Sequence, residues 1–120
     1  MKTQQWISKL FATIDRKDSL GFKTFLAEDC VFRFGNMPPV TGLESIGETV
    51  YQFFQSLKSI KHEIDGVIEE GNRIVCHGWV TYTKPDDSIL KVPFADIFTH
   101  DNYKIAEYFI FIDISGLIDG

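Results

Sequence analysis

Residues 59–84, SIKHEIDGVIEEGNRIVCHGWVTYTK, contain the pattern that indicates most clearly how this chain folds. Apolar and polar side chains alternate along most of the stretch, and the sequence Glu-Gly-Asn at positions 70–72 interrupts the alternation. A period of two is typical of β-strands, and turn-forming residues between two such runs indicate an antiparallel hairpin. The stretch therefore predicts two paired strands, near 59–69 and 73–84.

The alternating pattern continues after this stretch, whereas the first half of the chain has a helical pattern. Two more strands are predicted near 89–100 and 104–114, because turn-forming residues again separate the apolar runs. Apolar residues recur at spacings of three and four over 7–14 and over 43–57, which predicts a helix in each of these segments.

Between the two longer helices, the sequence predicts a short helix capped by Asp18 or Ser19 and a short strand from Cys30 to Phe34. Three helices followed by a four-stranded meander are typical of an α+β fold, with the helices on one face of a curved antiparallel sheet. No linker divides the sequence, so we expect one domain over residues 1–120.

The aromatic content is the unusual part of the composition. The 120 residues include 11 Phe, 4 Tyr and 2 Trp. Because aromatic side chains are costly to leave in water, this content indicates either a dense core or an apolar cavity. The two cysteines, Cys30 and Cys76, lie inside apolar runs, and we expect them to be buried and reduced.

The charge balance excludes several kinds of partner. The chain has 12 Lys and Arg against 17 Asp and Glu, which gives a net charge of -5. A protein that binds nucleic acid needs a basic stripe, so this charge argues against such a partner. No apolar run is long enough to span a membrane, and the first residues lack a secretory signal pattern. We therefore expect a cytoplasmic protein with neither nucleic-acid nor membrane partners.

Four short motifs point to a known superfamily. They are Leu-Ala-Glu-Asp-Cys-Val-Phe at 26–32, Pro-Pro-Val-Thr-Gly at 38–42, Asp-Ile-Phe at 96–98 and Lys-Ile at 104–105. With the order of the predicted elements, they resemble the nuclear transport factor 2-like (NTF2-like) superfamily, which includes SnoaL-like, ketosteroid-isomerase-like and limonene-epoxide-hydrolase-like proteins. The sequence departs from the family pattern at Tyr103, where the family usually has glycine.

The resemblance implies a cone-shaped, cystatin-like fold in which three N-terminal helices pack on a curved antiparallel sheet. It also implies an apolar pocket inside the cone and a homodimer formed through the outer face of the sheet. Such a fold gives the aromatic residues two places, the core and the pocket wall. The superfamily contains isomerases, hydrolases, cyclases and non-catalytic binders, so the fold alone leaves the function open.

The ketosteroid-isomerase-like mechanism fits the sequence poorly. That mechanism needs a carboxylate base, a tyrosine and a protonated aspartate. Asp96 falls where the family has this aspartate, but no tyrosine precedes Tyr51, and residues 30–43 contain no Asp or Glu. Two of the three groups are therefore missing.

Limonene-epoxide-hydrolase-like proteins use an Asp–Arg–Asp set, with a Tyr and an Asn that hold the attacking water. In this sequence Asp113 falls on one carboxylate, His77 on the arginine and Trp79 on the other carboxylate. Phe32 and Phe34 fall on the two water-holding residues. The resemblance thus argues against epoxide hydrolysis but leaves His77 and Asp113 as an acid–base pair.

SnoaL-like polyketide cyclases need one aspartate of raised pKa in an apolar pocket, and no cofactor. Asp96, between Phe94 and Phe98 on one strand face, fits that role with His77 as a helper. We therefore expect catalytic roles for Asp96 and His77, with Asp113 as a second carboxylate. The aromatic residues expected to line the pocket and bind the ligand are Phe32, Phe34, Trp79, Phe94, Tyr108 and Phe111.

Each catalytic candidate has a structural alternative. His77 could lie on the outer face of the sheet, Asp96 could pair with Arg33, and Asp113 could cap the turn that follows its strand. His62, His77 and His100 lack a ligand spacing, so no metal is expected, and no cofactor is expected either.

The expected function is binding of a small apolar molecule in the cone, with cofactor-free acid–base catalysis of isomerase, cyclase or hydrolase type as the candidate activity. The alternative is a non-catalytic ligand carrier or a dimerisation module. A cavity of roughly several hundred Å3 that contains both Asp96 and His77 would favour catalysis. A filled cone, or His77 outside it, would overturn the interpretation as an enzyme.

Overall fold

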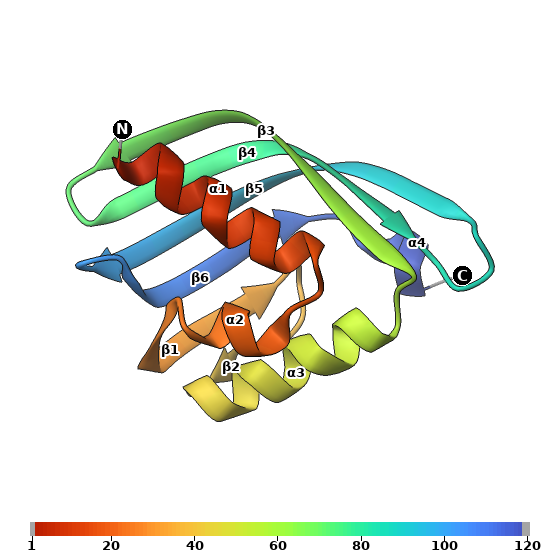
Figure 1. The fold of residues 1–120 in the computed structure, drawn as a ribbon, viewed down its shortest axis with the longest axis horizontal. Coiled ribbons are helices and arrows are strands. Elements are labelled where there is room, and N and C mark those ends of the chain that lie inside the picture. The colour runs from red at the N-terminus through yellow and green to blue at the C-terminus, as the bar shows by residue number, and fades with distance from the viewer. Residues whose placement is uncertain (1, 119–120) are drawn as a thin grey trace.

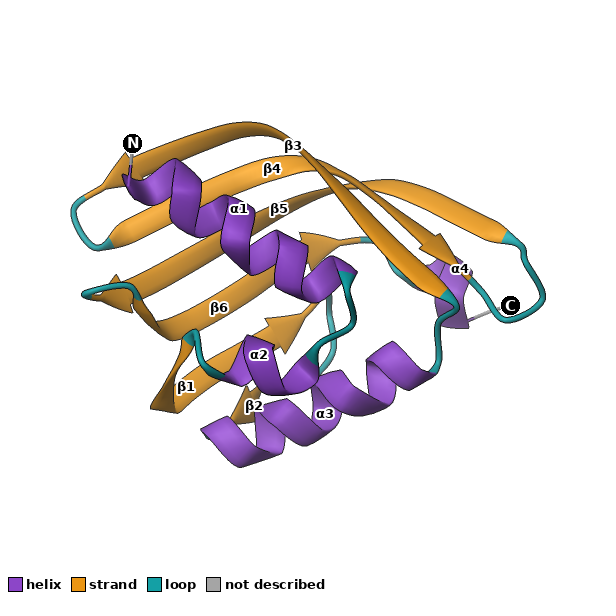
Figure 2. Cartoon of the chain, in the orientation of Figure 1, coloured by secondary structure: helices purple, strands orange, loops and turns teal. Residues whose placement is uncertain are grey.

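In the computed structural model, which describes residues 2–118, six strands form one curved sheet and the helices lie against its concave side (Figures 1 and 2). The elements in chain order are α1 (Lys2–Asp15), α2 (Ser19–Lys23), β1 (Leu26–Phe34), β2 (Val40–Thr41), α3 (Leu43–Gln55), β3 (Ser59–Glu70), β4 (Arg73–Thr83), β5 (Ile89–Asp101), β6 (Lys104–Ile112) and α4 (Ser115–Ile118). The α+β fold predicted from the sequence is confirmed. The short elements β2 and α4 were not predicted.

The strands are arranged in the order β2-β1-β6-β5-β4-β3. The predicted meander is present, because β3 to β6 pair antiparallel in succession. β1, however, pairs with β6 in parallel and places Phe32 beside Tyr108. The expectation of a wholly antiparallel sheet is therefore wrong at this one pairing, which joins strands too distant in sequence for a local pattern to reveal.

The helices follow from their apolar spacing and their caps. α1 buries a stripe that includes Ile7, Leu10 and Phe11, and it lies across the concave face of the sheet (Figure 1). α2 begins after Asp18, whose side chain accepts a hydrogen bond of 2.9 Å from the backbone N–H of Gly21. None of the described helices is long and apolar enough to cross a membrane.

The curvature of the sheet has a local cause in the hairpin of β3 and β4. The register of this pair shifts between Ile64 and Gly66, so β3 contains a bulge there. Gly78 of β4 lies opposite Ile64, and a Cβ atom at Gly78 would be only 1.8 Å from the backbone oxygen of Glu63. Because only glycine permits this approach of the two strands, Gly78 allows the bend that makes the sheet a cone.

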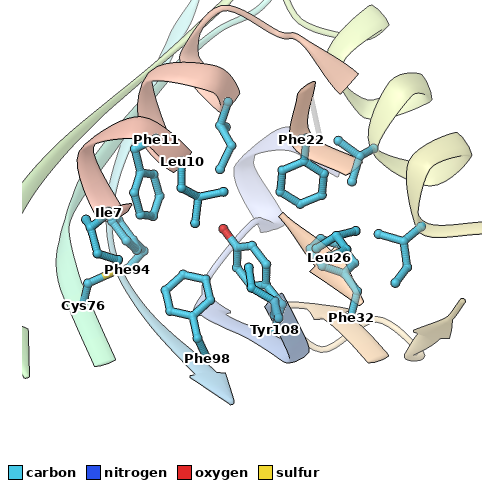
Figure 3. Close-up of a cluster of buried hydrophobic side chains, with 14 of the residues drawn as sticks. Ile7, Leu10, Phe11, Phe22, Leu26, Phe32, Cys76, Phe94, Phe98 and Tyr108 are labelled. Carbon is cyan, nitrogen blue, oxygen red and sulfur yellow. The ribbon is translucent and has the colours of Figure 1, made fainter. Parts of the chain in front are cut away.

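Aromatic pairs fix α1 on the sheet. The ring centroids of Phe11 and Phe94 are 5.9 Å apart (Figure 3), and those of Trp6 and Phe98 are 5.4 Å apart. Both distances fall in the range of favourable tilted or edge-to-face pairs. The apolar stripe of α1 is thus anchored on β5.

Cys30 and Cys76 are free and buried, as the sequence predicted. Burial is the main cause that raises the pKa of the Cys30 thiol to about 12. Burial also raises the pKa of the Cys76 thiol. Both side chains therefore act as small apolar core residues.

Candidate functional site

A cavity lies between the concave face of the sheet and the helices. Its lining residues come from α1, α2, α3 and all six strands. The volume of the cavity is about 100 Å3. This space exceeds the roughly 10–15 Å3 that a single water needs, but it is smaller than the cavity expected from the sequence. Met37, which is 48% exposed, and Pro38 are among the lining residues, so the cavity reaches the surface at this loop.

Four of the six aromatic residues predicted for the pocket line this cavity. They are Phe32, Phe34, Phe94 and Tyr108. Phe32 packs edge-to-face on Tyr108 with ring centroids 5.4 Å apart, and Phe34 packs on Phe53 of α3 at 5.0 Å. The aromatic content of the sequence thus builds both a core and a cavity wall, and the two share residues.

Asp96 is the buried carboxyl group of this cavity. It lines the cavity from β5, and its residue is 1% exposed. The hydroxyl of Tyr108 donates a hydrogen bond to Oδ2, whereas Oδ1 has no partner among the described residues. Burial raises the pKa of Asp96 well above its ordinary value, and the bond from Tyr108 opposes part of this rise. The neutral acid, which can donate a hydrogen bond, is therefore favoured.

The alternative that Asp96 pairs with Arg33 is wrong. The Arg33 guanidinium lies 5.0 Å from the ring centroid of Phe109 and 5.5 Å from that of Phe111. Phe111 is 45% exposed and belongs to the opposite face of β6 from Tyr108. Arg33 therefore lies on the outer face of the sheet, and no cation among residues 2–118 forms an ion pair with Asp96.

The prediction that His77 and Trp79 line the cavity is wrong. The buried residues of β4 are Ile74, Cys76, Gly78, Val80 and Tyr82, so the alternate residues point outward. The ring of His77 lies over Gly66 of β3, where an added Cβ atom would be 2.6 Å from Nε2. Trp79 is 41% exposed, with Lys91 Nζ 5.6 Å from its ring centroid. His77 therefore lies outside the cone, which is the result that argues against the catalytic role expected for it from the sequence.

Phe111 and Asp113 also lie outside the cavity, contrary to the prediction. In β6 the lining residues are Tyr108, Ile110 and Ile112, so Phe111 points to the outer face. Oδ1 of Asp113 accepts a 3.0 Å hydrogen bond from the backbone N–H of Ser115, and this bond lowers the pKa of the carboxyl. Asp113 thus caps the turn after its strand, and the three predicted catalytic residues do not converge.

A polar pair that the sequence did not predict lies at another part of the cavity wall. His62 of β3 lines the cavity, and its Nδ1 is 2.7 Å from Oδ1 of Asp15 at the end of α1. The backbone N–H of His62 donates to Oδ2 of the same carboxylate at 3.0 Å. Since the two residues are 47 positions apart, no motif or spacing could reveal this contact. Within residues 2–118, no group of three or more His, Cys, Asp or Glu side chains is arranged to hold a metal ion.

Solved structures with this arrangement of helices and strands define the class of fold. An NTF2-like protein of unknown function from Burkholderia pseudomallei K96243 has a TM-score of 0.83 at 16% identity, over 99% of this chain and 96% of that one. A proposed SnoaL-like polyketide cyclase from Shewanella putrefaciens CN-32 has a TM-score of 0.82 at 19% identity, over 99% and 95%. TerC, co-crystallised with polyporic acid, has a TM-score of 0.81 at 17% identity, over 96% and 94%. At such identities the likeness establishes the fold alone, which is that of the NTF2-like superfamily.

The sequence places the chain in one family of this class. The family model of the SnoaL-like domain matches residues 7–108. The chain therefore belongs to the SnoaL-like domain family. No curated protein sequence matches it.

Proposed function

We propose that this protein binds a small, largely apolar molecule in the cone, and that Asp96 donates a hydrogen bond to an acceptor oxygen of that ligand. The observation that carries the proposal is the unpartnered Oδ1 of Asp96 in an otherwise mostly apolar cavity. A buried polar group without a partner costs roughly 1–3 kcal/mol. A carbonyl oxygen on the ligand would remove this cost, so the pocket favours carbonyl compounds over hydrocarbons of the same shape.

The size of the cavity favours a ligand of about one aromatic ring. An apolar cavity of about 150 Å3 is enough to bind benzene. The cavity here is smaller, at about 100 Å3, but it opens beside Met37, so part of a one-ring ligand can extend toward the surface. The rings of Phe32, Phe34 and Phe94 in the wall suit edge-to-face contacts with an aromatic ligand.

A pair of ligands that differ only in the carbonyl group tests this proposal. We expect para-methylacetophenone to bind more tightly than para-isopropyltoluene, by a few-fold to about tenfold, which corresponds to one hydrogen bond. Calorimetric titration measures both affinities in the wild-type protein and in Asp96→Val. The variant should bind the two compounds equally. A wild-type protein that binds neither compound would contradict the proposal.

Acid–base catalysis of isomerase or cyclase type is a second candidate function. It is favoured by the raised pKa of Asp96, which lines a mostly apolar cavity. One similar structure is a proposed polyketide cyclase, which adds an analogy of fold. Exchange of the acetyl protons of para-methylacetophenone in D2O, followed by NMR, reports such chemistry. A non-catalytic carrier would bind the ketone without accelerating the exchange.

We also propose that two copies of the chain pair through the outer face of the sheet. The half-exposed side chains of Trp79 and Phe111 lie on this face. Exposed aromatic side chains of this kind are typical of interfaces between subunits. A homodimer would cover them and leave the mouth of the cavity at Met37 on another part of the molecule.

A further inference from the structure

Asp15 determines which nitrogen of His62 carries the proton. A carboxylate can only accept hydrogen bonds, so in the 2.7 Å contact the proton lies on Nδ1 of His62. In the neutral ring, Nε2 then carries a free lone pair. No residue within 2–118 forms a hydrogen bond with this nitrogen. The Asp15–His62 pair therefore presents a nitrogen that can accept a proton and that makes no hydrogen bond within the described residues.

His62 lies at the wall of the cavity, among aromatic side chains. The His62 side chain is only 9% exposed, and its ring lies 4.7 Å from that of Phe11 and 5.2 Å from that of Phe94. Asp96 follows Phe94 by two residues on the same face of β5, and both His62 and Asp96 line the cavity. No hydrogen bond joins His62 to Asp96, so each is available to a different part of one ligand.

We propose that His62, positioned by Asp15, is the proton acceptor of this pocket, and that the ligand is an aromatic carbonyl compound with an acidic phenolic or enolic hydroxyl. The inference rests on the proposed function, because it takes Asp96 as the group that binds the carbonyl. Without the pocket, the Asp15–His62 contact would only connect α1 to β3.

In the complex, one proton moves from the ligand hydroxyl to Nε2 of His62. The O–H bond of the ligand breaks, its electron pair stays on the ligand oxygen, and the proton forms an N–H bond at Nε2 of His62. The imidazolium then donates a hydrogen bond to the anionic oxygen, while Asp15 stabilises its charge through Nδ1. The step requires no other reactant.

Two matched ligands and two matched variants test the inference. We expect para-hydroxyacetophenone to bind the wild-type protein at least about tenfold more tightly than para-methylacetophenone, the effect of one charge-assisted hydrogen bond. Its absorption should shift to that of the phenolate on binding. In His62→Asn the amide can still donate to Asp15 but Nε2 is gone, so the preference and the shift should disappear. His77→Asn, the same change outside the cavity, should keep both.

The outcomes separate the two proposals. If the wild-type protein binds both ketones equally, or if His62→Asn keeps the preference, the inference is overturned and the ligand pocket stands. If the wild-type protein binds neither ketone, the pocket proposal fails and the inference fails with it.

A measurement without ligand tests the tautomer directly. Long-range 1H–15N correlation spectra distinguish the two neutral forms of a histidine ring. We expect His62 to carry its proton on Nδ1 in the wild-type protein and to populate both forms in Asp15→Asn. A proton on Nε2 in the wild-type protein would overturn the inference.

Discussion

The hydroxyl of Tyr108 donates a hydrogen bond to Oδ2 of Asp96 across 3.4 Å, and both residues are almost completely buried. The bond is long, so it compensates only part of the free energy lost when the carboxyl group leaves water. The other carboxyl oxygen has no partner in the described part of the chain. The pair is therefore a polar site that lowers the stability of the fold, which is a common property of groups retained for function.

The first prediction concerns Asp96→Asn and the pH dependence of stability. The pKa of Asp96 is raised in the folded protein, whereas the unfolded group titrates near 3.9. Between these two values unfolding releases a proton, so the free energy of unfolding falls as pH rises, by up to about 1.4 kcal/mol per pH unit. Asn cannot ionise, so the variant should lack this loss.

Urea denaturation at several pH values measures the effect. The stability of Asp96→Asn relative to wild type should increase from pH 4 upward and stay constant below it. A difference that does not change with pH would contradict a raised pKa for Asp96.

The second prediction concerns the hydroxyl of Tyr108. Tyr108→Phe removes the donor to Asp96 and should lower the free energy of unfolding by about 1 kcal/mol. Tyr82→Phe is the matched control, because Tyr82 is also buried and lines the cavity, and its hydroxyl makes no hydrogen bond within the described residues. Denaturant titration of both variants should show the smaller loss for Tyr82→Phe; equal losses would show that the bond to Asp96 is not the cause.

The inner face was assigned correctly from the sequence for β5 but not for β4. In β5 the alternation of Phe94, Asp96 and Phe98 predicted a buried carboxylate, and all three are buried. In β4 the residues His77 and Trp79 were favoured because of their chemistry. The other alternating set of β4, from Ile74 to Tyr82, was the more apolar one and would have indicated the inner face.

The third prediction concerns Gly78, where β3 and β4 approach closely. A Cβ atom at this position would overlap the backbone oxygen of Glu63, which cannot move without breaking the bulged hairpin. Gly78→Ala should therefore destabilise the protein by about 3 kcal/mol or more. The measurement is the midpoint of urea denaturation followed by circular dichroism.

Gly47→Ala provides the control for this prediction. Gly47 lies inside α3, and an added Cβ atom would meet only the flexible stem of Lys23. Because alanine is favoured over glycine in helices by about 1 kcal/mol, this variant should be neutral or slightly stabilised. Similar losses in Gly78→Ala and Gly47→Ala would contradict the close approach at Gly78.

The fourth prediction tests the proposed homodimer. Trp79→Glu and Phe111→Glu each place a charge on the outer face, and each should raise the dissociation constant of the dimer by about tenfold or more, as expected for aromatic interface residues. Sedimentation velocity at several concentrations measures this constant. Leu20→Glu is the control, because Leu20 is 75% exposed on α2, away from that face. A wild-type protein that stays monomeric at all concentrations would contradict the proposal.

The Asp15–His62 contact shows what a single sequence cannot reveal. His62 occupies a position in an alternating strand, and Asp15 ends a helix, so each has an ordinary local role. Their contact depends on how far α1 extends across the sheet, which is set by the packing of its apolar stripe and not by any motif. Cavity shape depends on the same packing, which explains why the sequence identified the aromatic wall but not its second polar group.

The parallel pairing of β1 with β6 determines when the cavity can form during folding. Leu26 pairs with Ile105, and Phe32 with Tyr108. The part of the cavity wall formed by β1 and β6 therefore needs the first and the last strand of the chain. Contacts between residues so distant in sequence form late and slow the folding reaction. While the hairpins of β3, β4 and β5 are already able to form, β1 is paired only with the two-residue strand β2, and its other edge waits for β6. The pairing that completes the pocket therefore also sets the period in which a newly made chain is most exposed to aggregation.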